Sequence, residues 1–143
     1  MFTETDAAIV GRLDGYDRAV EVGVGERPAV AGGLAERGVG VTATDISERP
    51  VPEWVRFVRD DVTDPTLDHY RSAEVVYALN CPPELQRPLV DVARRVGAAC
   101  HFTTLGADPA VVPATRETLP RETLFRASGA AVDSRAPPRG ERP

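Results

Sequence analysis

The 143-residue chain contains no lysine, and all 17 of its basic residues are arginines. This composition is typical of a high-GC coding bias or of adaptation to salt. The chain is acidic overall, with a net charge of −5, and residues 1–110 carry the acidic excess. A negatively charged domain repels phosphate backbones, so the composition gives no strong signal for nucleic-acid binding.

Cysteine and histidine are also scarce, with two residues of each. Cys81, Cys100, His69 and His101 do not have the spacing of a recognisable ligand set, so we expect no metal site. We expect both thiols to be reduced and buried. The sequence places no histidine beside Cys81, which argues against a nucleophilic role for it.

Long hydrophobic runs are missing as well. No stretch approaches the ~18 apolar residues of a membrane span. The N-terminal segment MFTETDAAIV lacks the basic start and the apolar block of a signal peptide. We therefore expect a cytoplasmic protein with no membrane contact.

The length and the 42% content of hydrophobic residues suit a single globular domain. The segment AAVDSRAPPRGERP, residues 130–143, has little to bury and is rich in proline and arginine. We expect it to be a disordered tail. The domain is then expected to span residues 1–129.

Apolar segments of strand length alternate with segments of helical periodicity, which predicts a parallel sheet with right-handed crossovers. A capping box at TETD starts the first helix, and a second begins at Pro28. Pro88 would break a continuous helix over residues 81–97, so the main helix is expected to begin there. The expected strands lie at residues 18–23, 39–45, 55–61, 73–80 and 98–104, with one more at 121–128. The fold class is α/β, a doubly wound, Rossmann-like sheet of strand order 3-2-1-4-5 plus an extra C-terminal strand.

Ligands of open α/β sheets bind beyond the carboxyl ends of the strands. In this sequence those ends carry glycines followed by polar residues, in the order of the strands. That combination is more specific than a lone G-x-G. The residues concerned are Gly23 and Gly25, Asp45, Asp60 and Asp61, Asn80, and Thr103 and Thr104.

These residue types suit an adenosine group. Gly23 and Gly25 have no side chain, so a ligand can approach the backbone. Asp45 follows the second strand at the distance typical of a carboxylate that accepts from ribose hydroxyls. Asp61, after the third strand, can accept from the amino group of adenine. The alternatives are a tight strand-to-helix turn at the glycines and a turn-capping role for Asp45.

The glycine loop distinguishes two kinds of cofactor. The dinucleotide fingerprint G-x-G-x-x-G requires a third glycine, where this chain has Pro28, and a pyrophosphate there would face Glu26. Glu21 instead gives the pattern E-x-G-x-G. S-adenosylmethionine has a sulfonium, an ammonium and no phosphate, which suits an acidic site better.

With E-x-G-x-G after the first strand, the sequence resembles class I S-adenosylmethionine-dependent methyltransferases. The resemblance implies that Glu21, Gly23 and Gly25 hold the methionine end of the cofactor. It implies Asp45 for the ribose, and Asp61 with Val62 for the adenine. More narrowly, VEVGVGERPAVAGGLAERGVGVTATDI, DDVTDP and PPELQRPLVDVARR resemble a family of short, uncharacterised archaeal proteins with a trimmed version of that domain.

One motif bears on catalysis. NCPPEL, residues 80–85, is similar to the Asn-Pro-Pro-aromatic motif with which amino-group methyltransferases orient the target amine. Cys81 is inserted here, and Glu84 stands in place of the aromatic residue. Asn80 is the catalytic candidate, and a plain turn is its alternative.

These observations leave three hypotheses. The first is a protein that binds the small-molecule cofactor S-adenosylmethionine and transfers its methyl group to an unknown acceptor. The second is a non-catalytic regulatory module that binds adenosine or a dinucleotide. The third is an NAD-binding subunit that works with a partner chain.

Overall fold

The computed structural model describes residues 2–128, so the predicted tail at 130–143 lies outside the described part of the chain. Its helices are α1 (Glu4–Leu13), α2 (Ala29–Glu36), the short 3-10 helix η1 (Leu67–His69) and α3 (Pro83–Val96). Its strands are β1 (Arg18–Val22), β2 (Gly40–Asp45), β3 (Val55–Arg59), β4 (Val75–Ala78), β5 (Ala99–Phe102), β6 (Ala114–Leu119) and β7 (Glu122–Ala127).

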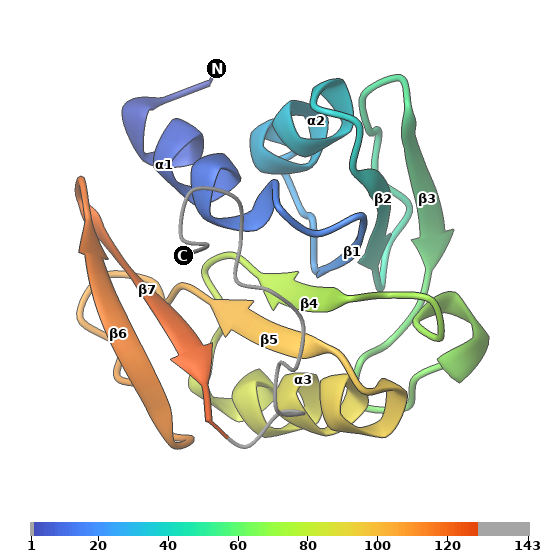
Figure 1. The fold of residues 1–143 in the computed structure, drawn as a ribbon. Coiled ribbons are helices and arrows are strands. Elements are labelled where there is room, and N and C mark those ends of the chain that lie inside the picture. The colour runs from blue at the N-terminus through green and yellow to red at the C-terminus, as the bar shows by residue number, and fades with distance from the viewer. Residues whose placement is uncertain (1, 129–143) are drawn as a thin grey trace.

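The strands form one sheet in the order β3-β2-β1-β4-β5-β7-β6 (Figure 1). The first five are parallel neighbours, which confirms the predicted order 3-2-1-4-5. β7 confirms the extra strand and runs antiparallel to both β5 and β6. The sequence did not predict β6, because only one of its six side chains is buried and its sequence shows no regular apolar alternation.

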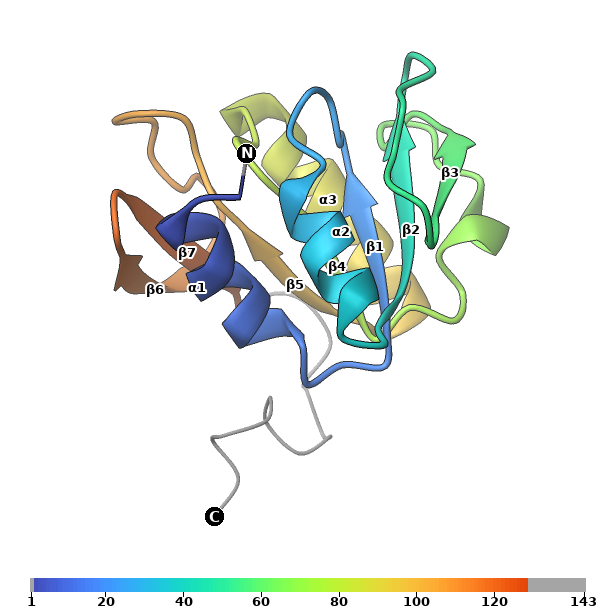
Figure 2. The same cartoon turned by 90° about the horizontal axis from the view of Figure 1, so that it is seen from above.

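Helices cover both faces of the sheet, with α1 and α2 on one side and α3 on the other (Figures 1 and 2). Each side has its own core of buried apolar residues. Ile9, Leu13 and Leu34 belong to the core under α1 and α2. Leu89 and Phe102 belong to the core under α3. The fold is therefore doubly wound, as the alternation of strands and helices predicted.

The capping box predicted at the start of α1 is present. The Asp6 backbone N–H donates to Thr3 Oγ1 at 3.0 Å, and the Thr3 N–H donates to Asp6 Oδ2 at 3.0 Å. This pair satisfies two backbone donors that the first turn leaves without helical partners.

α3 corrects one of our predictions. It begins at Pro83 and continues through Pro88, where we had expected the main helix to start. A proline inside a helix removes one backbone hydrogen bond, but the apolar stripe around it packs on the sheet and holds the helix together. Leu89 and Val92 of this stripe are fully buried. Gly97 ends the helix with φ 73°, as predicted.

The connection between β5 and β6 contains no helix. Both strands pair antiparallel with β7, so they run parallel to each other. Parallel strands are usually joined through a helix. Here the connection is residues 103–113, which contain neither helix nor strand. One face of the β6–β7 hairpin is therefore bordered by this loop instead of by a connecting helix.

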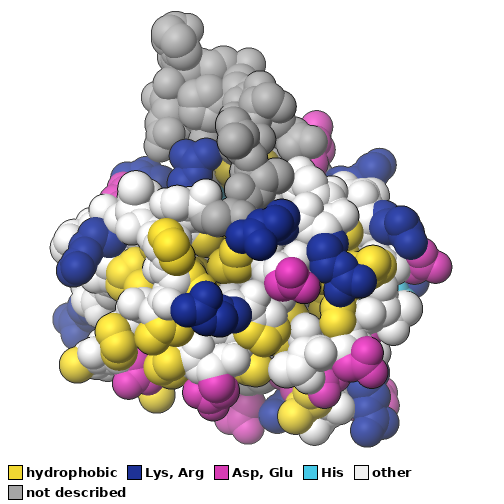
Figure 3. Space-filling view, turned by 90° about the horizontal axis from the view of Figure 1, so that it is seen from below, with side chains coloured by type: hydrophobic (Ala, Val, Ile, Leu, Met, Phe, Trp, Pro, Cys, Tyr) yellow, Lys and Arg dark blue, Asp and Glu magenta, His cyan; other side chains and the backbone are white. Residues whose placement is uncertain are grey.

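The surface on the α3 side is mixed in charge. Figure 3 shows arginine and acidic side chains scattered among apolar ones on this face. Within residues 2–128, no helix is both long and apolar enough to cross a membrane.

Candidate functional site

The carboxyl ends of β1 to β5 lie along one edge of the sheet because these strands are parallel. The predicted residues therefore gather at this edge.

The glycine loop after β1 has a backbone that favours glycine. Gly23 has φ 72° and Gly25 has φ 52°, in the left-handed region. The N–H groups of Gly23 and Val24 both donate to the Thr44 carbonyl at 2.9 Å, which fixes the loop to β2. A Cβ on Gly23 would meet no atom within 4 Å, so the space above that residue is open.

Asp45 joins the end of β2 to this loop. Its Oδ2 accepts from the Gly25 N–H at 2.8 Å, and its Oδ1 accepts from the Ser47 N–H at 3.1 Å. The Nε of Arg49 lies 3.6 Å from Oδ1. Each carboxylate oxygen can accept a further hydrogen bond, so these contacts leave capacity for a ligand hydroxyl. The structure thus brings Asp45 and Gly25 together; the ribose contact stays a prediction.

Glu21 lies inside the sheet and is fully buried. Its Oε1 accepts from the Tyr77 hydroxyl at 2.7 Å, and its Oε2 has no hydrogen-bond partner in the part of the chain that the structure describes. Burial raises the pKa of Glu21. The Tyr77 hydroxyl and the charge of Arg27 act in the opposite direction but are weaker, so the pKa is about 8. The carboxyl is not exposed to solvent, and its role toward the methionine end of a cofactor stays a prediction.

The acidic pair after β3 divides into a structural residue and an accessible one. Asp60 accepts from the Tyr70 hydroxyl at 2.9 Å and from the Thr66 N–H at 3.1 Å. Asp61 is exposed and accepts from the N–H and the hydroxyl of Thr63, which lower its pKa. The neighbouring Val62 is buried. The adenine contact predicted for Asp61 and Val62 is not tested by these contacts.

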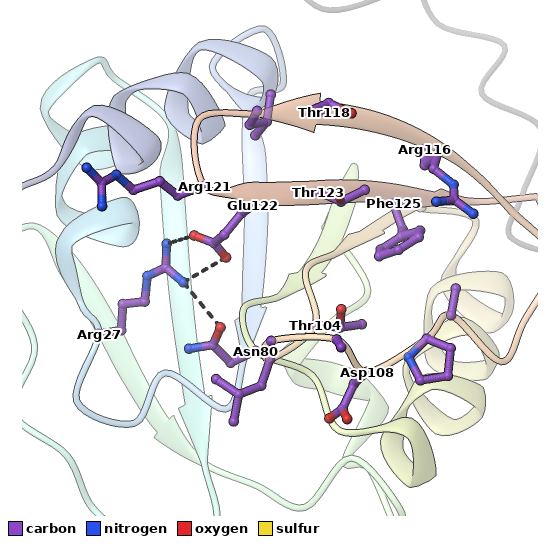
Figure 4. A pocket seen from close by; sticks show the side chains of 16 residues that line it. Arg27, Asn80, Thr104, Asp108, Arg116, Thr118, Arg121, Glu122, Thr123 and Phe125 are labelled. Atoms are coloured by element: carbon purple, nitrogen blue, oxygen red, sulfur yellow. Dashed lines mark hydrogen bonds and ion pairs between the residues drawn. The ribbon is translucent and has the colours of Figure 1, made fainter.

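Asn80 forms the turn after β4. It has φ 54°, and its N–H donates to Thr103 Oγ1 at 2.8 Å. Its side chain is exposed and points toward Arg27, whose Nη1 lies 3.5 Å from Oδ1 (Figure 4). Both cysteines are free and buried, as predicted. Burial raises the pKa of the Cys81 thiol to about 12, which argues against a nucleophilic role.

Arg27 is a residue whose role the sequence did not reveal. Its guanidinium donates to both carboxylate oxygens of Glu122, at 2.7 and 3.2 Å, and to Asp6 Oδ1 at 3.0 Å. Burial opposes the charge of Arg27, but these two carboxylates hold its pKa above the usual value. Arg27 thereby links the glycine loop to α1 and to β7. Neither carboxylate is near Arg27 in sequence, so no local motif marks the cluster.

A cavity of about 840 Å³ borders this cluster. Arg27 and Asn80 lie at one side, the β6–β7 hairpin forms one wall, and residues 104–110 form another (Figure 4). Within residues 2–128, no group of three or more His, Cys, Asp or Glu side chains could hold a metal ion.

Solved structures share this fold. MtNAS in complex with MTA and tNA aligns with a TM-score of 0.59 and 18% identity, over 85% of this chain and 56% of that one. The 1,6-didemethyltoxoflavin-N1-methyltransferase of Burkholderia thailandensis, with S-adenosylhomocysteine bound, aligns with a TM-score of 0.51 and 21% identity, over 86% and 59% of the two chains. This chain spans a little over half the length of these structures. It has a trimmed class I methyltransferase-like fold.

Proteins related by sequence are more similar to this chain than these solved structures are. A UPF0146 protein of Halobacterium salinarum is 60% identical over 119 residues, which are 82% of this chain and 92% of the relative. The model of UPF0146, described as an uncharacterised protein family, matches residues 4–129. The chain therefore belongs to the UPF0146 family of archaeal proteins.

Proposed function

We propose that this protein binds S-adenosylmethionine at the carboxyl ends of β1, β2 and β3 and uses it as a methyl donor. The observation that carries the proposal is the link between the glycine loop and Asp45, 2.8 Å from the Gly25 nitrogen to the carboxylate. It brings a backbone surface open to a ligand beside a carboxylate, and ribose hydroxyls can donate to such a carboxylate. Asp61, exposed after β3, is the proposed adenine contact, with Val62 beside it.

The charges of the site suit a cationic ligand. Glu26 in the loop is exposed, and Arg27 is already bound to carboxylates. Among the described residues, the loop therefore has no unpaired cation that would favour a pyrophosphate. Glu21 contributes a buried oxygen without a partner, two residues before Gly23. The charge of exposed Glu26 favours a ligand with an ammonium and a sulfonium over the pyrophosphate of NAD, whereas Glu21, which burial keeps protonated at neutral pH, offers only a hydrogen-bond acceptor.

Methyl transfer needs little acid–base help from the chain. When bound, S-adenosylmethionine supplies a methyl group on a sulfonium, which is a good leaving group. The protein must orient the acceptor toward that methyl group and keep the two together. Asn80 is the proposed orienting residue, because its exposed side chain borders the cavity.

Calorimetric titration with S-adenosylmethionine, S-adenosylhomocysteine and NAD, each at low and at high salt, tests the proposal. We expect both sulfur ligands to bind more tightly than NAD at both salt concentrations. Preference for NAD would overturn the proposal in favour of a nicotinamide-binding subunit. Binding of the sulfur ligands without turnover would leave a regulatory module.

Turnover is tested by transfer of a labelled methyl group to pooled cell extract. Asn80→Gly is the sharper variant, since glycine keeps the positive φ of this turn and removes the amide. We expect it to bind S-adenosylhomocysteine like the wild type and to transfer far less label. Transfer in proportion to the folded protein would instead make Asn80 a turn residue only.

A further inference from the structure

We propose that the cavity beside the β6–β7 hairpin holds the methyl acceptor, and that this acceptor is a small organic anion with a carboxylate or phosphate group. That the ligand of this cavity is the methyl acceptor rests on the proposed methyl transfer. The anion site itself rests on the cavity, its charges and its walls.

The cavity has the size and the place of a small-molecule site. Its volume of about 840 Å³ lies within the range of such sites, roughly 300–1,000 Å³. It is open because residues 103–113 join β5 to β6 without a helix. Arg27 and Asn80 place one side of it next to the glycine loop, where the methyl donor is proposed to bind (Figure 4).

The charges around the cavity favour an anion. Three arginines line it: Arg27, Arg116 and Arg121. Arg27 and Glu122 neutralise each other. Across residues 2–128, neither Arg116 nor Arg121 forms an ion pair. Asp108 is the remaining carboxylate of the lining, so the cations exceed the anions.

The hairpin wall combines this charge with hydroxyl groups and an aromatic ring. Arg116 pairs with Phe125 across the two strands, and Thr118 pairs with Thr123. Residues two apart on a strand face the same side, so these four side chains share the face toward the cavity. Phe125 is held by stacking on Phe102, with ring centroids 5.2 Å apart. A guanidinium beside hydroxyls and a fixed ring suits an anionic group on an apolar body.

The position of Asp108 gives the ligand a direction. It comes from the loop on the side opposite Arg116 and Phe125 (Figure 4). An anionic group would be repelled there and attracted to Arg116. The other end of the molecule, which carries a neutral nucleophile, then lies toward Asn80. Its lone pair would bond to the methyl carbon as the carbon–sulfur bond breaks, which leaves S-adenosylhomocysteine, and the proton of the nucleophile would go to water.

Titration of the ¹⁵N-labelled protein with benzoate and with phenyl phosphate, followed by NMR, tests the site. Benzamide and phenol are the neutral counterparts. We expect the anions to shift the backbone amide signals of Thr118, Thr123 and Phe125, and the neutral molecules to shift them much less. Arg116→Gln should weaken anion binding about tenfold, the value of a lost charge-assisted hydrogen bond. Arg56→Gln, on β3 at the opposite edge of the sheet, removes the same charge and should have no effect.

Equal shifts by the neutral molecules, no shifts by either anion, or equal losses in the two variants would overturn the proposal. Titration with S-adenosylhomocysteine is carried out separately on the same proteins. If the wild type does not bind S-adenosylhomocysteine but the anions still shift the amide signals, the proposed function is overturned and the anion site stands. The two failures are therefore distinguishable.

Discussion

Glu21 has a carboxyl group buried inside the sheet, with one oxygen that has no partner among the described residues. A fully buried carboxyl with one unpaired oxygen is costly when charged, and burial raises its pKa from 4.5 to about 8. The folded state therefore holds a proton that the unfolded state has lost between these two pH values. Stability must fall as pH rises through that window and level off above it.

Glu21→Gln should remove this pH dependence. The amide is neutral at all these pH values and keeps an oxygen that can accept from Tyr77. In urea unfolding at pH 5, 7 and 9, the free energy of unfolding of the variant should rise relative to that of the wild type as the pH increases. At ~1.4 kcal/mol per pH unit, the gain reaches several kcal/mol at most. Exposed Glu48→Gln is the control, and parallel profiles of the Glu21 variant and the wild type would contradict the prediction.

Asp45 can be tested in the same way at the proposed ribose site. Asp45→Ala should weaken binding of S-adenosylmethionine by about 1–3 kcal/mol, because the ribose hydroxyls lose a charged acceptor. It should also lower stability, since the Gly25 and Ser47 N–H groups lose their partner. Calorimetry measures the affinity of the Asp45 variant for S-adenosylmethionine. The control is Asp91→Ala, which changes an exposed residue on α3. Unchanged affinity in a folded Asp45 variant would remove the ribose assignment.

At the scale of elements, α3 allows one substitution to be compared at two positions. Pro88 lies inside the helix, where a proline costs about 3 kcal/mol, against at most ~1 kcal/mol gained by restricting the unfolded chain. Pro88→Ala should therefore raise the free energy of unfolding by about 2 kcal/mol. Pro83→Ala should not, because proline is favourable in the first turn. Urea unfolding of both variants checks this, and an equal effect of the two would contradict it.

The elements divide into those that the sequence predicts and those that it does not. β1, β2 and β4 are mostly buried, so their apolar runs predict them. β6 has few buried side chains and exists through its pairing with β7, which sequence periodicity does not report. α3 passes Pro88 because tertiary packing outweighs a local penalty. The packing that carries α3 past Pro88 is non-local. The partner of β6 is local, because β6 and β7 form a hairpin, but the exposed side chains of β6 leave no apolar pattern.

The candidate site likewise contains features that the sequence predicts and contacts that it does not. The sequence predicted Gly25 and Asp45 after the carboxyl ends of two strands, and in the structure they form a hydrogen bond of 2.8 Å. The partner of Glu21 was not predictable, because Tyr77 comes from a different strand. The Arg27 cluster brings together residues 21 and 95 positions apart. Such contacts depend on the strand order rather than on any local motif.

At the scale of the whole molecule, we propose a single domain that ends near residue 129. The basis is composition, since residues 130–143 offer almost nothing apolar to bury. Deletion of residues 130–143 should leave the melting temperature nearly unchanged in a calorimetric scan. A large drop would show that the domain needs this segment.

Arg27 joins two segments that are far apart in sequence, because it binds α1 through Asp6 and β7 through Glu122. The side chains of Asp6 and Glu122 are 4% and 18% exposed, so removal of the cation leaves two poorly hydrated carboxylates without their partner. Arg27→Gln should therefore lower the free energy of unfolding by about 2–3 kcal/mol, somewhat less than for a fully buried pair.

The matched control for this variant is Arg37→Gln. Arg37 binds Asp14 at 2.9 Å with half of its own side chain exposed, and surface pairs of this kind contribute about 0–1 kcal/mol. Arg27→Lys keeps the charge but cannot hold Glu122 with two parallel hydrogen bonds, so its loss should fall between the two. Urea unfolding of the three variants measures this order. Equal losses for Arg27→Gln and Arg37→Gln would mean that the other contacts between α1 and the hairpin, among them the Thr5–Pro120 hydrogen bond and the Arg12–Glu117 ion pair, suffice without Arg27.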